Sequence, residues 1–154
     1  MHVIPFAFET STSAPVSDSI LTLFGSAEAA RNPLQLVLLA QQGLSAGKAL
    51  FVSKCLQLDA NQMAGLLGIT SKTFRTYQQE DRVLDATKSE QVLKLAQVVE
   101  LGKEVFGDME SFNRWLQKPA YGLAGKLPID LFYTSGGIDL VADELTRIAY
   151  GDLA

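Results

Sequence analysis

The sequence predicts an all-α fold with a helix-turn-helix core followed by a small C-terminal helical domain. Apolar residues recur with helical spacing in most segments, and no strand-like alternation extends beyond a few residues. Glycine and proline residues stand where such helices would begin or end. The chain has 154 residues, 47% of them hydrophobic, so it can bury a core, which excludes a disordered regulator.

The first 30 residues predict an N-terminal tail that is flexible in part. The first 17 are rich in Ser, Thr and Pro and lack a helical period. Residues 18–30 can form a short helix. Its apolar face would contain Ile20, Leu21 and Phe24.

Three helices are expected next along the chain. Pro33 suits the first turn of a helix. Ser45 can cap a second helix over residues 46–58. Asp59 can cap a third helix, because Gln62 follows three residues later in the arrangement of a capping box.

The second half of the chain predicts a long helix and shorter helical segments after it. The long helix runs from about residue 87 to residue 106. Asp108 would cap a short helix, and Pro128 would open a brief helical turn. The Gly136–Gly137 pair is interpreted as the end of that turn, and the last helix then covers residues 138–150.

The stretch Ala60–Gln79 meets the requirements of a helix-turn-helix motif. Such a motif needs a small residue where its helices approach, which is Ala64, and a glycine at the left-handed turn, which is Gly68. Apolar residues must also lock the two helices together. The residues at those points are Met63, Leu67, Ile69, Phe74 and Tyr77.

The second helix of this motif would run over residues 71–79 and present a polar face to DNA. Arg can hydrogen-bond guanine, Gln can pair with adenine, and Ser, Thr and Lys can hold phosphates. The candidate DNA-binding residues are Thr70, Ser71, Lys72, Arg75, Thr76 and Gln79. The alternative is a solvated face on a structural hairpin, because Glu80 and Asp81 would repel phosphate.

Charge is segregated along the chain, whose formal net charge is −4. Residues 31–97 carry eight Lys and Arg against five Asp and Glu, whereas residues 98–154 carry five against nine. The helix-turn-helix therefore lies in the basic segment, and a local basic footprint matters more for phosphate contact than total charge. The acidic C-terminal segment favours a different partner.

No catalytic, cofactor or metal site is predicted, so an enzyme is disfavoured. His2 is the single histidine, and no nucleophile stands beside a candidate base. The single cysteine, Cys55, can form no internal disulfide and suits a reducing compartment. The sequence has neither a signal-peptide pattern nor a run of about 20 apolar residues, which predicts a cytoplasmic protein without a membrane partner.

The helix-turn-helix is followed by a long helix and a phenylalanine-glycine pair. A tryptophan-leucine pair and a series of prolines and glycines come next. The C-terminal landmarks are Trp115, Leu116, Pro119, Gly125, Pro128, Leu131, Gly137 and Gly151. From about Asn32 onward, this order of parts resembles the Xre/ParS/MbcA family of antitoxins. The resemblance implies a helix-turn-helix domain over residues 31–106 and a toxin-binding domain over residues 107–154.

The resemblance also implies a function and partners. The chain would neutralise a cognate RES-domain toxin, which attacks NAD or modifies a protein target. The C-terminal domain would cover the toxin's active site, and the helix-turn-helix would bind operator DNA and repress the operon. Homodimers would assemble into a higher-order toxin-antitoxin complex. The candidate toxin-binding residues are Asp143, Arg147, Tyr150, Gly151, Asp152, Leu153 and Ala154.

Charge gives this implied role a physical basis. A toxin that binds NAD must offer positive charge to the pyrophosphate, and an acidic domain would be steered toward such a site. Asp152 and the carboxylate of Ala154 could imitate the charge of that ligand. Asp139, Asp143 and Glu144 are interpreted as a solvated helix face, and the alternative is that at least one of them contacts the toxin.

The sequence departs from the family pattern in places. Ser89-Glu90-Gln91 stands where a Ser-Asp-Arg trio is usual, and Ala120 stands where asparagine is usual. Three residues follow Gly151, so a plug built from this end would be short. Two alternatives stay open: a free-standing repressor without a toxin, and a helical adaptor whose helix-turn-helix serves only for dimerisation.

Overall fold

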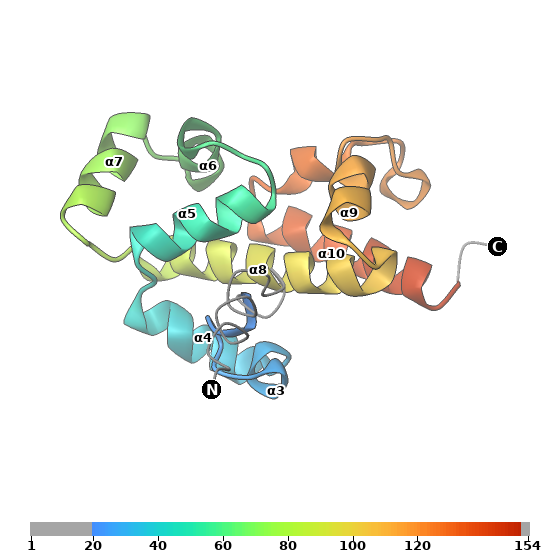
Figure 1. Ribbon diagram of the computed structural model, residues 1–154, viewed down its shortest axis with the longest axis horizontal. Coiled ribbons are helices and arrows are strands. Elements are labelled where there is room, and N and C mark those ends of the chain that lie inside the picture. Colours follow the sequence, from blue (N-terminus) through green and yellow to red (C-terminus); the bar gives the residue numbers. More distant parts are fainter. Residues whose placement is uncertain (1–19, 152–154) are drawn as a thin grey trace, which may run out of the picture.

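The computed structural model describes residues 20–151, and one long helix, α8, runs through the middle of this part of the chain (Figure 1). Within these residues there is no strand, only an isolated bridge between Ser45 and Val83, which confirms the all-α prediction. The helices are α3 (Ala27–Ala30), α4 (Pro33–Gln42), α5 (Ala46–Cys55), α6 (Ala60–Leu67), α7 (Ser71–Gln79), α8 (Ala86–Phe106), α9 (Met109–Leu116) and α10 (Ser135–Ala149), with the 3₁₀ turns η1 (Tyr121–Leu123) and η2 (Pro128–Leu131).

Side-chain caps fix where several of these helices begin. The predicted capping box of α6 is confirmed, because the Asp59 carboxylate accepts from the Gln62 amide and the Gln62 side chain accepts from the Asp59 amide, both at 2.8 Å. Asp85 caps α8 by accepting from the backbone amide and the ammonium group of Lys88. These hydrogen bonds from Lys88, first from its side chain, lower the pKa of the Asp85 carboxyl.

Both the N-terminal and the C-terminal parts of the described chain pack against helix α8. Its fully buried residues include Val92, Leu95, Ala96 and Val99. Figure 1 shows α4 on one side of α8, the helices α5 to α7 on another, α9 at the C-terminal end of α8, and α10 running along α8. Helix α8 packs against both the N-terminal and the C-terminal parts of the described chain. The expected domain boundary at residue 106 therefore stays a prediction.

Gln91 ties the two parts of the molecule together. Its side-chain amide donates to the backbone oxygen of Leu66 in α6 at 2.8 Å and to that of Phe132, after η2, at 3.0 Å. This is the position where the family resemblance predicts an arginine. The glutamine is buried, and its two hydrogen bonds satisfy the amide nitrogen without a buried charge.

The N-terminal part of the described chain differs from the predicted short helix over residues 18–30. The backbone turns after Ile20, where the Leu23 amide donates to the Ile20 oxygen at 3.0 Å, and α3 begins only after its cap Ser26. Ile20 and Phe24 are nevertheless buried in the core. The mobile tail predicted for the first 17 residues lies outside the described residues.

Two predicted helix ends were wrong. The helix expected over residues 46–58 ends at Cys55, because Leu56 takes the cap position and Gln57 turns into a left-handed conformation with φ of 59°. The Gly136–Gly137 pair does not end a turn but lies in the first turn of α10. The hydroxyl of Thr134 caps that helix by accepting from the Gly137 amide at 3.0 Å.

Candidate functional site

Helices α6 and α7 form the helix-turn-helix that the sequence predicts. Gly68 adopts the left-handed conformation of the turn, with φ of 73°, and the Ile69 amide donates to the Ala64 oxygen at 3.0 Å. Phe74 is fully buried and holds α7 against the core. The motif is therefore rigidly attached to the rest of the molecule, with α7 at one extreme of it (Figure 1).

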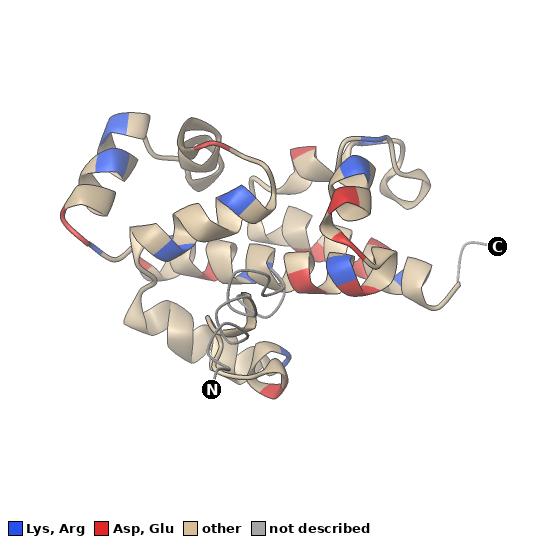
Figure 2. Cartoon of the chain, in the orientation of Figure 1, with Lys and Arg blue, Asp and Glu red and all other residues tan. Residues whose placement is uncertain are grey.

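The outer face of α7 presents most of the candidate DNA-binding residues. Lys72, Arg75 and Gln79 are exposed, so their polar groups can reach a partner. Figure 2 shows two basic bands on α7. Ser71 and Thr76 are half-buried at its sides.

Thr70 has a structural role before any role in binding. Its hydroxyl caps α7 by accepting from the Thr73 amide at 3.0 Å and donates to the Thr73 hydroxyl at 2.9 Å. A cap at this point fixes the start of the helix whose first turns face outward. The Thr70 hydroxyl is therefore used within the helix and has little hydrogen-bonding capacity left for DNA.

Arg82 is a further cation beside α7 that the sequence analysis did not single out. Its guanidinium lies 4.5 Å from the centre of the Tyr77 ring and 3.7 Å from the Glu80 carboxylate. It thus partly balances the acidic turn that was expected to repel phosphate. The only sequence signal was an arginine directly after a Glu-Asp pair.

The candidate toxin-binding residues in the described chain lie on the last turns of α10. Asp143 is exposed, and Tyr150 is 83% exposed. Gly151 follows them with φ of 69°, which ends the helix. Asp152, Leu153 and Ala154 lie outside the described residues.

Arg147 and Glu144 form an ion pair that the sequence did not predict. Glu144 was interpreted as part of a solvated face, but it is only 3% exposed and accepts from the guanidinium of Arg147. The guanidinium also donates to the Gly122 oxygen at 3.3 Å. The 3₁₀ turn η1, which contains Gly122, lies against this side of α10 and helps to bury Glu144 through a long-range contact.

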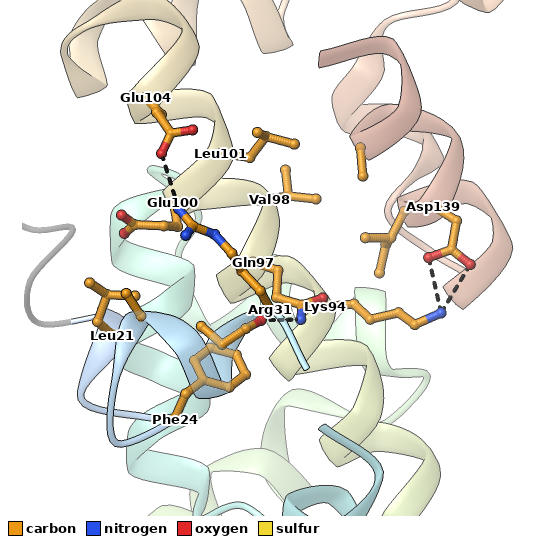
Figure 3. Close-up of a pocket in the computed structure, with 14 residues that line it drawn as sticks. Leu21, Phe24, Arg31, Lys94, Gln97, Val98, Glu100, Leu101, Glu104 and Asp139 are labelled. Carbon is orange, nitrogen blue, oxygen red and sulfur yellow. Dashed lines mark hydrogen bonds and ion pairs between the residues drawn. The ribbon is translucent and has the colours of Figure 1, made fainter. Parts of the chain in front are cut away.

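Other charged side chains of α8 and α10 lie at the rim of a cavity. The cavity has a volume of about 300 Å³ and lies between α3, α8 and α10. Figure 3 shows Lys94 donating to both carboxylate oxygens of Asp139, each at 3.0 Å, and Arg31 facing Glu104 at 3.5 Å. The Asp139 carboxylate is therefore already paired with Lys94 within the chain, which makes it a weaker candidate for a toxin contact.

The described residues offer little to catalysis or metal binding. Burial raises the pKa of the Cys55 thiol to about 11, so the thiol is protonated at neutral pH and is a poor nucleophile. Between residues 20 and 151 no three His, Cys, Asp or Glu side chains gather as metal ligands would. No helix in that range is both long and apolar enough to cross a membrane.

The fold and its outward basic helix define a helix-turn-helix protein with a second, acidic helical part. Comparison with protein families agrees with this. Residues 35–97 match the antitoxin Xre-like helix-turn-helix domain, and residues 101–151 match the antitoxin Xre/MbcA/ParS C-terminal toxin-binding domain. The chain belongs to the Xre/MbcA/ParS antitoxin family.

A named relative supports the assignment more weakly. The chain is similar to the protein named Antitoxin Xre from Pseudomonas putida, with 28% identity over 83 residues. That alignment covers 54% of this chain and 52% of the relative, so the chain spans about half the length of the relative it matches.

Proposed function

We propose that this chain is an antitoxin that binds a cognate RES-domain toxin and neutralises it by covering the toxin's active site. The observation that carries the proposal is the match of residues 101–151 to a toxin-binding domain, directly after a helix-turn-helix domain. The end of α10 supports it, because Asp143 and Tyr150 are exposed there and available to a partner. Both the toxin and the DNA would be met in the cytoplasm.

The charge of the C-terminal part suits this role. Residues 98–154 carry nine Asp and Glu against five Lys and Arg. Acidic side chains would be attracted to a site that is positively charged for a phosphate-bearing ligand such as NAD. Residues 151–154 are proposed to be the part that reaches furthest into that site.

The function is tested by isolating the chain from its host with an N-terminal tag, which leaves the C-terminal end free. We expect mass spectrometry to identify a RES-domain protein in near-stoichiometric amount. The separated partner should consume NAD or transfer ADP-ribose to a protein, and adding the chain back should stop this. A partner without a RES domain, or activity that the added chain does not reduce, would contradict the proposal.

We also propose that α7 binds operator DNA and that the complex represses its own operon. Lys72, Arg75 and Gln79 are exposed along one side of a helix at the edge of the molecule, which suits insertion into the major groove. Arg82 adds a cation at the end of α7. One copy carries few such groups, so a dimer that reads two half-sites would bind more tightly.

The variant Arg75→Ala tests DNA binding. We expect roughly a 10-fold or greater loss of operator affinity, because an arginine that contacts guanine contributes about 1–3 kcal/mol to discrimination between bases. Lys118→Ala is the matched control, since Lys118 is an exposed cation after α9. Fluorescence anisotropy at several salt concentrations would measure both. Equal losses in the two variants would indicate non-specific attraction and contradict reading by α7.

We further propose that the chain forms a homodimer through the outer face of α4. Leu34 is 63% exposed, and Val37 and Leu38 are exposed beside it at the spacing of one helix face. Helix α4 contains no charged residue, which Figure 2 shows as an unbroken neutral helix. In a two-fold contact each residue faces its own copy or a close neighbour, so a neutral apolar face can pair with itself without repulsion.

The other proposed partners leave the α4 face free. We propose that the toxin binds residues 101–151, which match the toxin-binding domain, and that DNA binds α7. Helix α4 packs near the opposite end of α8 from α9 (Figure 1). A second copy is therefore the occupant that fits this surface. Such dimers, each copy holding a toxin, would form the higher-order complex.

A further inference from the structure

A loop beside α10 displays the most exposed large hydrophobic side chain of the described residues. Tyr121 is 92% exposed, in the 3₁₀ turn η1. Tyrosine is enriched at binding hot spots, because it supplies a large amphipathic surface with few rotatable bonds. Its exposure makes Tyr121 a candidate contact for a partner.

The loop that carries Tyr121 is held in a single shape by its own hydrogen bonds. The Ala120 amide donates to the Lys126 oxygen, and the Gly125 amide donates to the Ala120 oxygen, both at 3.0 Å. Ala120 and Leu123 are buried and anchor the loop to the core. A binding loop that is already ordered loses less entropy when a partner binds.

The ion pair of α10 clamps this loop to the end of the helix. The Arg147 guanidinium donates to the buried Glu144 carboxylate and to the Gly122 oxygen, next to Tyr121. A Cβ at Gly122 would overlap the Glu144 carboxylate and the Arg147 guanidinium, so a larger residue there would displace the ends of both side chains. The clamp therefore fixes where Tyr121 lies relative to α10.

Tyr150 is a second exposed tyrosine near the clamp in the chain. It follows Arg147 by three residues, which is about one helical turn, and it is 83% exposed. The clamp thus has an exposed tyrosine near each of its partners: Tyr121 directly precedes Gly122, and Tyr150 follows Arg147 by about one turn. Aromatic residues around an arginine are the composition typical of an interface centre.

We propose that Tyr121 and Tyr150 together form the surface on which the toxin docks, and that Glu144 and Arg147 are positioning residues that hold the loop of Tyr121 in place. This rests on the proposed antitoxin function. The occupant is the toxin rather than a second copy, because the surface lies within the family's toxin-binding domain. The acidic character of residues 98–154 also disfavours pairing of this part with its own copy.

The test measures the affinity of the purified full-length chain for its RES-domain toxin. Tyr121→Ala and Tyr150→Ala should each lower the affinity at least about 10-fold, mainly by faster dissociation. Tyr133→Ala is the matched control, because Tyr133 is 59% exposed on the same domain but precedes the first turn of α10. It should bind as the wild type does.

The positioning role has its own test. Glu144→Ala should weaken toxin binding and speed hydrogen exchange at the Gly125 and Lys126 amides, whereas operator binding should be unchanged. Glu144→Gln keeps an acceptor for Arg147 and should restore part of the toxin affinity. If Glu144→Ala weakens toxin and operator binding alike, the residue acts on the whole fold and the positioning role is overturned.

The outcomes separate the two proposals. If the wild-type chain does not bind the toxin, the proposed function fails. If the wild type binds and neither tyrosine variant is weakened relative to Tyr133→Ala, the docking surface is overturned while the function stands.

Discussion

Phe112→Ala should lower the free energy of unfolding by about 3–5 kcal/mol, the usual cost of removing a fully buried aromatic ring. Phe112 has no exposed surface and lies with its ring centre 6.3 Å from both Phe106 and Trp115. Its other side faces Gly102 so closely that a Cβ there would overlap the ring. The cavity left by alanine would open between α8 and α9.

Urea denaturation followed by circular dichroism would measure this loss. Because domains of this size are stable by about 5–15 kcal/mol, the variant should be close to unfolding at 37 °C. Leu140→Ala is the control, since Leu140 is an exposed leucine of α10 and should change stability by less than about 0.5 kcal/mol. A loss under 1 kcal/mol for Phe112→Ala would contradict the packing described.

The same measurement tests whether the chain unfolds as one unit. Trp115, the single tryptophan, reports by fluorescence on the junction of α8 and α9, whereas circular dichroism reports on all helices. Since α8 serves both parts and Gln91 bonds to each, the two signals of the wild type should change at the same urea concentration.

The helix-turn-helix could be predicted from the sequence because its determinants are local. A capping box at Asp59, a small residue at Ala64 and a left-handed glycine at Gly68 all act within 10 residues of each other, and the structure confirms each. The first turn of α10 was missed for a related reason. A glycine pair is a common helix end, and only the geometry of the Thr134 cap shows that the helix has already begun.

The C-terminal site could be predicted only in outline. Asp143 and Tyr150 are exposed as expected, but Glu144 is buried and Arg147 is engaged with it. Helical periodicity places these residues on a helix, but it does not say which outward side a distant loop covers. The contact that decides this joins Arg147 to Gly122, 25 positions apart, and leaves no pattern in either segment. Tyr121 was missed because a single tyrosine in a loop has no periodicity to mark it.

The double variant Leu34→Asp with Leu38→Asp should convert the proposed dimer into a monomer of about 16.7 kDa. In a two-fold contact both copies gain the same charges on facing surfaces, so like charges meet and must also lose water. Both side chains are exposed within one copy, so the fold should be kept and the circular dichroism spectrum should not change. Analytical ultracentrifugation would measure the mass in solution.

The matched control is Leu140→Asp, which places the same charge on an exposed leucine of α10 and should leave the dimer intact. Operator binding should weaken in the double variant as well, because one α7 reads one half-site and the second half-site is no longer held nearby. Toxin binding should persist, since residues 101–151 are unchanged. A double variant that stays dimeric would show that α4 is not the interface. A wild-type chain that is monomeric would contradict the proposed dimer. Weakened operator binding together with retained toxin binding is the expected pattern, because the dimer supports DNA binding by α7 and leaves the toxin-binding part of each copy unchanged.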